Sequence, residues 1–267
     1  LGPTGAVAIP EFNTRFTRQM LVDTQPKDFN TLLRLSGFSH GTDVWLGNAK
    51  DLIDSGICTI SEVIGTRDNI MVYLIHKGLE EGRAFKITET VRKGLVAKGK
   101  VSAEDWSAME DDMRSHGVPE WYIESCHKIK YMFPKAHAAA YVMMAWRVAY
   151  CKVFYPLAYY AAYFSIRASG FTYKLMCQGR DKLEYHLAEY KSRSDSLSKK
   201  EQDTLRDMRI VQEMYARGFE FMPIDIYRAK ARNFQIIDGK LMPSLSSIDG
   251  LGEKAADAIV FAAEDGK

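Results

Sequence analysis

The sequence has 267 residues, of which 46% are apolar and 26% are charged, and its formal net charge is +2. These proportions are ordinary for a globular protein with a packed core. No apolar run approaches the roughly 18 residues that span a bilayer, and no signal peptide opens the chain, so we expect a cytoplasmic protein. Because the chain starts at Leu1 and stops inside an expected helix, we expect both ends to be cuts in a longer protein. The four cysteines are far apart and form no CxxC pair, which predicts scattered buried thiols rather than disulfides or a zinc site.

Hydrophobic periodicity predicts a mainly α-helical fold. Capping residues, prolines and glycines indicate where each helix begins and ends. The expected helices cover residues 11–24, 28–36, 44–52, 61–77, 81–96, 102–116, 119–131, 134–155, 178–191 and 199–218, with an aromatic helix after Pro156. Residues 38–43 are expected to form a polar loop, and residues 192–198 a serine-rich connector.

The C-terminal part departs from this helical pattern. Residues 233–237 and 240–242 flank Asp238-Gly239, which predicts a small β-hairpin with a type I′ turn. Residues 245–259 then predict a helix-hairpin-helix. We therefore expect a helical domain over residues 1–198, followed over residues 199–267 by a connecting helix, the β-hairpin and the helix-hairpin-helix.

Charge is unevenly distributed along the chain. Residues 125–180 contain no Asp or Glu over 56 residues but carry eight Lys and Arg, so this stretch has a formal charge of +8 and the remainder −6. Such segregation favours an electropositive face for an anionic partner. The alternative is that carboxylates from elsewhere in the fold pair with these cations.

Two motifs could place phosphate-binding groups. Phe133 to Tyr141 reads FPKAHAAAY, in which a proline fixes a helix start whose free N–H groups favour an anion, while three alanines leave the helix surface bare. At about 100° per residue, His137, Tyr141 and Arg147 fall on one arc of about 120°. A base could lie near Tyr141, with phosphates near Lys135, His137 and Arg147. The plainer alternative is an alanine-rich core helix with a satisfied histidine.

The second motif is the glycine turn of the expected helix-hairpin-helix. Gly250 and Gly252 bracket Leu251, so the turn is tight and its N–H groups can point at a phosphate, with Lys254 as an added cation. Such a turn holds the DNA backbone without reading its sequence. The alternative is an ordinary turn between two helices.

The FPKAHAAAY motif resembles the fingers-domain signature of the C-family bacterial DNA polymerases. Further stretches resemble the Gram-positive PolC-type DNA polymerase III alpha subunits in particular, in order along nearly the whole chain. They are residues 9–12, 18–21, 35–49, 118–123, 215–219 and 223–227.

The resemblance implies a fragment of a replicative DNA polymerase that binds incoming dNTP and primer-template DNA. The implied nucleotide-binding residues are Lys135, His137, Tyr141, Arg147, Ser39, His40, Arg92 and Lys93. The implied DNA-binding residues are Gly250, Leu251, Gly252 and Lys254. No metal ligand and no catalytic residue are expected in this chain, because the family's Mg²⁺ ions are held by palm carboxylates that nothing here matches. The resemblance also implies a sliding clamp and replisome proteins as partners of the full-length enzyme, no membrane, and no activity of the fragment alone.

Two other readings remain open from the residues. One is a stand-alone, non-enzymatic DNA-binding module, and the other is a purely structural helical scaffold. Protection of the chain by dNTP, compared with protection by DNA alone, would separate a DNA-binding module from a polymerase segment.

Overall fold

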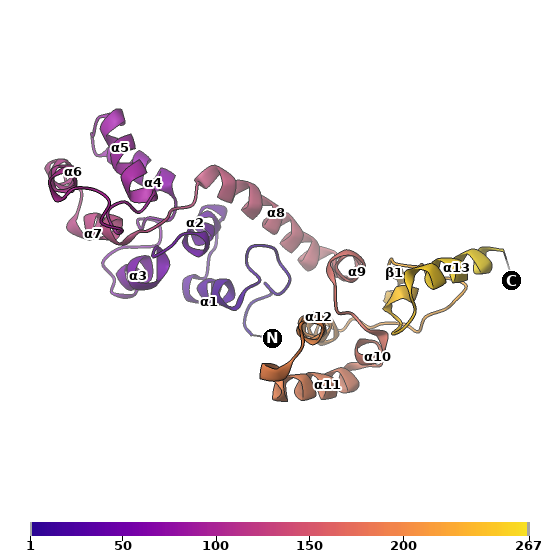
Figure 1. The fold of residues 1–267 in the computed structure, drawn as a ribbon. Coiled ribbons are helices and arrows are strands. Elements are labelled where there is room, and N and C mark those ends of the chain that lie inside the picture. Colours follow the sequence, from indigo (N-terminus) through magenta and orange to yellow (C-terminus); the bar gives the residue numbers. More distant parts are fainter. Residues whose placement is uncertain (1, 266–267) are drawn as a thin grey trace. The chain divides into compact units, whose positions relative to one another are not determined.

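The computed structural model describes residues 2–265 and confirms a mainly helical fold with one small β-hairpin. The chain forms two compact units (Figure 1). The first unit comprises Thr4–Trp146, and the second comprises Arg147–Lys267 together with Leu1–Pro3. The boundary falls inside the long helix α8 (Lys135–Phe154). The domain boundary expected after Ser198 lies within the second unit and stays a prediction.

The first unit is built from short helices around a core of aliphatic and aromatic side chains. Leu35, Phe38, Ile70, Leu74 and Ile87 are at most 2% exposed. The helices are α1 (Arg15–Thr24), α2 (Phe29–His40), α3 (Lys50–Asp54), α4 (Arg67–His76), α5 (Glu81–Arg92), α6 (Ala103–Ser115), α7 (Glu120–Lys128) and the start of α8. A π-helical turn, η1 (Trp45–Ala49), leads into α3.

Side-chain caps explain where several of these helices begin. The Asp28 carboxylate accepts the N–H of Thr31 at 2.8 Å, and the Ser102 hydroxyl accepts that of Asp105 at 3.1 Å, as the sequence predicts. Thr14 accepts the N–H of Thr17, so α1 begins at Arg15 and not at residue 11. Asn69 accepts the N–H of Thr66, so α4 begins six residues later than predicted.

Helix α2 differs most from its prediction. It runs through Gly37 to His40, although the sequence predicts a stop at residues 36–37 and a loop over residues 38–43. A Cβ atom at residue 37 would lie 2.1 Å from the carbonyl oxygen of Gly65, so the glycine permits close packing and does not end the helix. The added turn buries Phe38, whose ring stacks on Trp45 with centroids 4.8 Å apart.

Smaller boundary differences follow from local geometry. Non-helical backbone at residues 46–48 splits the helix expected over residues 44–52 into η1 and α3. Helix α5 ends at Arg92, four residues early, because Gly94 adopts a left-handed φ of 66°. Helix α7 ends at Lys128, where Lys130 and Thr42 begin a backbone pairing between two segments far apart in sequence.

The second unit packs its helices around an apolar core that contains a largely buried polar network. Its elements are α9 (Pro156–Ala162), η2 (Tyr163–Arg167), α10 (Tyr173–Met176), α11 (Arg180–Ser192), η3 (Ser194–Ser196) and α12 (Lys199–Ala216). Lys152 and Glu213 form a buried ion pair at 2.7 Å, and the Tyr160 hydroxyl donates to Glu213 at 2.6 Å. The buried Asp207 accepts the N–H groups of Ser169 and Gly170, which fixes the loop after η2 against α12.

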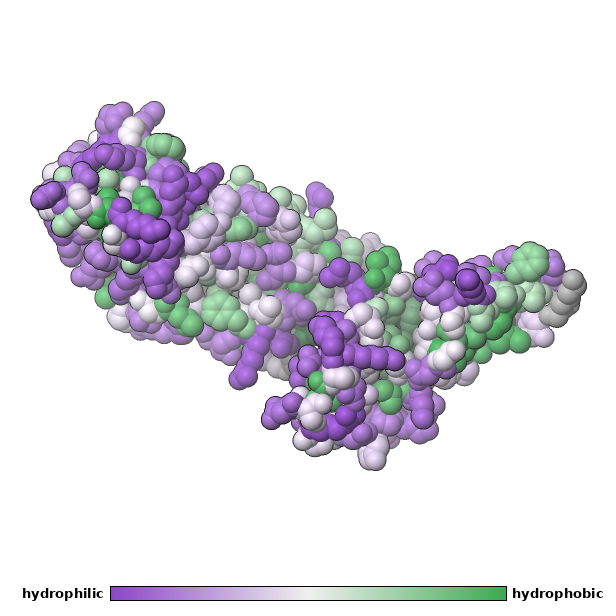
Figure 2. Space-filling model, in the orientation of Figure 1, coloured by the Kyte–Doolittle hydropathy of each residue, from purple (hydrophilic) through white to green (hydrophobic). Residues whose placement is uncertain are grey.

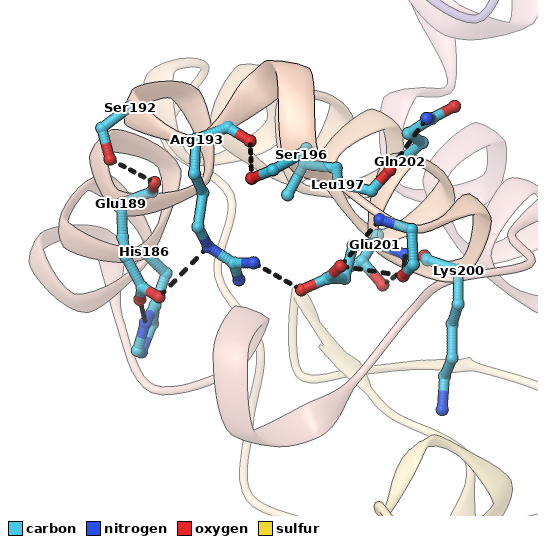
Figure 3. A network of polar contacts seen from close by, with 11 residues as sticks. His186, Glu189, Ser192, Arg193, Ser196, Leu197, Lys200, Glu201 and Gln202 are labelled. Atoms are coloured by element: carbon cyan, nitrogen blue, oxygen red, sulfur yellow. Dashed lines mark hydrogen bonds and ion pairs between the residues drawn. The ribbon is translucent and has the colours of Figure 1, made fainter.

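Arg193 organises the connection between α11 and α12, where a serine-rich connector is predicted. Its guanidinium lies 2.6 Å from Glu201 and 3.7 Å from Glu189, and so joins the end of one helix to the start of the next (Figure 3). Ser198 and Glu201 form a reciprocal capping box at the start of α12. The connector is therefore an ordered turn with specific side-chain bonds.

The C-terminal part of the second unit contains the predicted hairpin. Strand β1 (Gln235–Ile237) pairs antiparallel with β2 (Lys240–Met242), and both turn residues, Asp238 and Gly239, have positive φ, as a type I′ turn requires. A 3₁₀ turn, η4 (Leu245–Ser247), and helix α13 (Glu253–Glu264) follow. Ala229, Met242, Leu245 and Ala256 form a small separate core beneath them.

Candidate functional site

The first turn of α8 is capped by a carboxylate from another helix. The sequence predicts free N–H groups here, but the N–H of Lys135 donates to the Asp68 carboxylate of α4 at 2.8 Å. Asp68 thus occupies part of the positive end of the helix dipole. An anion at this helix start would compete with Asp68.

Four rings form a row beside the start of α8, which we call the aromatic row: His40, Phe133, His137 and Tyr141. His40 stacks on Phe133 with centroids 4.7 Å apart, and Phe133 meets His137 edge to face at 5.1 Å. His137 then lies 4.6 Å from Tyr141, and the Tyr141 side chain is 47% exposed. The row therefore joins the end of α2 to α8 and presents aromatic surface to solvent.

Glu11 holds the first ring of this row. The His40 Nε2 atom lies 2.5 Å from the Glu11 carboxylate, which is mostly buried although His40 is 40% exposed. The backbone of Glu11 has a φ of 68°, a left-handed conformation that is unfavourable for a side chain with a Cβ atom. The surrounding fold keeps this conformation, and with it the orientation of the His40 ring.

Lys135 lies on a different side of α8 from His137 and Tyr141. Ala138, Val142 and Ala145 are at most 1% exposed and form the face that packs into the first unit. Lys135 and His137 are two positions apart on α8, so their side chains point in directions about 160° apart around the helix axis. They therefore lie on opposite sides of the buried face. Arg147 is exposed on the same helix but begins the second unit. The residues that the sequence groups together are thus distributed over two sides of α8 and over both units.

Lys135 lines a cleft of about 370 Å³ within the first unit. The remaining lining comes mainly from the starts of α2 and α4. It comprises Asp28, Asn30, Thr31, Leu33, Arg34, Ser61, Thr66 and Asn69. Arg34 donates to the carbonyl of Val63 at 2.5 Å, and burial lowers the pKa of its guanidinium, which nonetheless stays charged. The cleft therefore offers two cations beside polar groups.

Three other predicted residues have internal partners. The Ser39 hydroxyl donates to the carbonyl of Ser36 in its own helix. Arg92 and Lys93 lie 2.6 Å and 3.2 Å from Glu89, and these cations, Arg92 first, lower the pKa of Glu89 to about 2. Because Glu89 offsets their charge, Arg92 and Lys93 attract phosphate less than unpaired cations would.

The fold brings counter-charges to part of the acid-free stretch. Lys130 pairs with Asp43 at 2.8 Å, and Lys152 with Glu213, so the pairing alternative holds for these two. Over residues 2–265, no carboxylate forms an ion pair with the other six. These are Lys128, Lys135, Arg147, Arg167, Lys174 and Arg180. Much of the predicted positive charge thus remains available.

The glycine turn has the expected tight geometry but lacks a preceding α-helix. Gly250 has a φ of 84°, and the N–H of Leu251 donates to Ile248 at 3.1 Å. Leu251 packs against the small core, while Lys254 is exposed and has no ion-pair partner among the described residues. The predicted first helix is only the 3₁₀ turn η4, because the N–H groups of residues 245 and 246 donate to the carbonyls of residues 230 and 231.

Two residues of the site escape the sequence prediction. Phe133 stands inside the FPKAHAAAY motif, directly before the proline, and its position there is a signal that could have included it. Glu11 lies 29 residues from His40, and no spacing rule connects them. Only the fold brings that carboxylate to the aromatic row.

No group of three His, Cys, Asp or Glu side chains among residues 2–265 could hold a metal ion. No helix within the same range is long and apolar enough to cross a bilayer.

Residues 1–117 match the family model described as the bacterial DNA polymerase III alpha subunit finger domain. The whole chain is also similar to curated proteins named DNA polymerase III PolC-type. The identity is 51% over 264 residues to the protein of Oceanobacillus iheyensis, 48% over 265 to that of Caldanaerobacter subterraneus, and 53% over 267 to that of Streptococcus sanguinis. Each alignment covers 99% of this chain but only 18% of the relative.

Proposed function

We propose that the chain is a segment of a PolC-type DNA polymerase III, and that it binds the incoming dNTP through the aromatic row and the DNA backbone through the glycine turn. In the full-length enzyme it would serve template-directed DNA synthesis during chromosome replication. The observation that carries the nucleotide part of this proposal is the exposed ring of Tyr141, whose centroid lies 4.6 Å from that of His137 beside the start of α8.

The aromatic row suits a nucleobase. Every base has a π-face, and stacking of a base on an aromatic side chain contributes about 1–3 kcal/mol. Tyr141 offers such a face, while His40 and Phe133 support His137 from the other side. Lys135 and Arg147 have no ion-pair partner among residues 2–265 and are proposed as phosphate ligands, although helical spacing directs Lys135 away from His137. Because Asp68 already accepts an N–H group at the start of α8, we propose cation side chains, rather than helix N–H groups, as the principal phosphate ligands.

The glycine turn suits a phosphate of the DNA backbone. Over residues 2–265, the N–H groups of Gly250 and Gly252 have no hydrogen-bond acceptor, and Lys254 extends from the first turn of α13. Small residues leave room for a DNA strand to approach, and contacts of this kind do not depend on base sequence. The turn would therefore hold the duplex without selecting where the polymerase binds.

The described residues do not fit the Mg²⁺ ions that the family relationship implies. Catalytic magnesium in phosphoryl transfer needs converging carboxylates, and no such group exists among residues 2–265. We therefore propose no metal-dependent step for this segment.

Steady-state kinetics of a full-length PolC-type enzyme carrying this segment tests the proposal. Tyr141→Ala removes the exposed ring and should raise the KM for dNTP at least fivefold, because stacking contributes about 1 kcal/mol or more. Tyr185→Ala is the matched control, since Tyr185 is 70% exposed on α11 and lies outside the proposed site. If Tyr141→Ala weakened primer-template binding while the KM for dNTP stayed constant, α8 would belong to a DNA-binding surface instead.

A further inference from the structure

A short basic segment runs beside the glycine turn. Exposure alternates along it: Arg228, Lys230 and Arg232 are exposed, whereas Ala229 is 5% exposed and Ala231 is half-buried. Ala229 belongs to the small core, and Ala231 packs against it. The alanines therefore anchor the segment while the cations face solvent. We call Arg228, Lys230 and Arg232 the basic edge.

Backbone hydrogen bonds tie the basic edge to the element that leads into the glycine turn. The N–H of Leu245 donates to the carbonyl of Lys230 at 3.0 Å, and that of Ser246 donates to the carbonyl of Ala231 at 2.9 Å. At the start of the basic edge, the Gln235 side chain donates to the carbonyl of Arg228 at 2.8 Å. The position of the basic edge relative to η4 is thus fixed by the backbone.

The three cations of the basic edge have different surroundings. Arg232 lies 2.8 Å from Asp257 and 3.7 Å from Glu253, so it offsets both carboxylates in the first turns of α13. Over the described part of the chain, Arg228 and Lys230 have no ion-pair partner. Arg232 therefore connects the basic edge to the end of the glycine turn and reduces repulsion of an anion there, while Arg228 and Lys230 are free to bind one.

The position of these cations suits a nucleic-acid backbone. Arg228 ends a turn and Lys230 follows it in irregular backbone, so two exposed cations lie close together in sequence beside the glycine turn. The surface around α13 shows a hydrophilic patch next to an apolar one, as expected where a charged edge borders a small core (Figure 2). Charge, exposure and backbone attachment thus agree.

We infer that Arg228 and Lys230 form a second phosphate-binding element, which grips the same duplex DNA as the neighbouring glycine turn. This inference rests on the DNA-binding role proposed for that turn. Arg232 acts as a positioning residue that holds the basic edge against α13. Two contact points on one small body would fix the direction of the backbone as well as its position.

Salt-dependent binding of a fluorescein-labelled duplex to the full chain tests the inference. The double variant Arg228→Ala/Lys230→Ala removes two phosphate contacts, so the slope of log K against log salt should fall by about 1.8. The same relation gives a loss of roughly 60-fold in affinity at 0.1 M salt. The matched control, Lys199→Ala/Lys200→Ala, removes equal charge from the start of α12 and should leave the slope unchanged. Far-UV circular dichroism checks that each variant is folded.

Separate variants distinguish this inference from the proposed function. If Gly252→Leu and Lys254→Ala weaken binding but Arg228→Ala/Lys230→Ala does not, the glycine turn binds DNA and the inference is wrong. If only Arg228→Ala/Lys230→Ala weakens binding, the basic edge binds DNA, but the role of the glycine turn is wrong, and with it the claim that both elements hold the same duplex. An equal loss in the Lys199→Ala/Lys200→Ala control would show a general charge effect and overturn the inference.

Discussion

Replacing Glu11 by alanine removes the carboxylate that orients His40 in the aromatic row. A hydrogen bond to a charged group contributes about 1.5–3 kcal/mol when it is well shielded. His40 is 40% exposed, so solvent reduces this contribution to about 1 kcal/mol. If the orientation of His40 supports the nucleotide surface, that energy corresponds to a roughly fivefold rise in the KM for dNTP.

The assay is steady-state kinetics of the full-length enzyme with dNTP and primed template varied separately. Glu11→Ala should raise the KM for dNTP while the kcat and the affinity for DNA stay nearly constant, since Glu11 acts through His40 and not on the reacting atoms. Glu11→Gln keeps an oxygen that can accept the hydrogen bond, so it should restore most of the affinity. This rescue identifies a positioning effect.

Glu11→Gly separates positioning from stability. Glycine adopts the φ of 68° at this residue without the penalty of about 1 kcal/mol that a Cβ atom causes, so Glu11→Gly should melt a few degrees above Glu11→Ala. The KM for dNTP should nevertheless rise as in Glu11→Ala. An unchanged KM in both variants would refute the role of Glu11, whatever their melting temperatures.

Four further outcomes are expected. Lys135→Ala and Arg147→Ala should each raise the KM for dNTP about tenfold in steady-state kinetics with DNA affinity nearly intact, and loss of primer-template binding would instead place α8 in the DNA channel. The pKa of Glu89 is lowered from its ordinary 4.5 to about 2, so its stabilising contribution is complete above pH 4.5 and is lost as the pH falls toward 2. The difference in melting temperature between the unmodified chain and Glu89→Gln should therefore shrink over that window, and a constant difference would contradict the role of Glu89. Gly37→Ala places a Cβ atom 2.1 Å from a backbone oxygen and should cost about 3 kcal/mol in urea unfolding, whereas a neutral result would mean that α2 can shift. The chain with Mg²⁺, primed template and dNTPs should extend no primer in a gel assay, and clear extension by a sample free of other polymerases would require a hidden carboxylate site.

Local signals predicted most of the helices because their ends depend on neighbouring residues. Asp28 and Ser102 cap their helices through side chains three residues from their partners, and Asp238-Gly239 specifies its own turn. Gly37 shows where such reasoning fails. A glycine after a helical run usually marks an end, but here it allows close contact with Gly65, which no local pattern reveals.

The candidate site likewise has features that local sequence predicts and features that only the fold determines. His137 and Tyr141 are four residues apart on a helix, so their stacking follows from helical spacing. The positions of His40, Glu11 and Asp68 beside α8 depend on packing between helices. The sequence places phosphates near both Lys135 and His137, yet these residues are two apart on α8, so helical geometry directs their side chains to different sides.

The acid-free stretch obtains its counter-charges only from distant parts of the chain. Asp43, Asp68 and Glu213 reach it from helices or turns more than 60 residues away in sequence. In the denatured ensemble these partners are dispersed, and the stretch is a continuous +8 polycation. Long polyanions should therefore bind the unfolded chain tightly at low ionic strength and, by mass action, compete with folding. Refolding in the presence of nucleic acid should consequently be more efficient at moderate salt. Salt partly shields the native ion pairs, but it weakens the non-specific binding of nucleic acid to the unfolded chain much more.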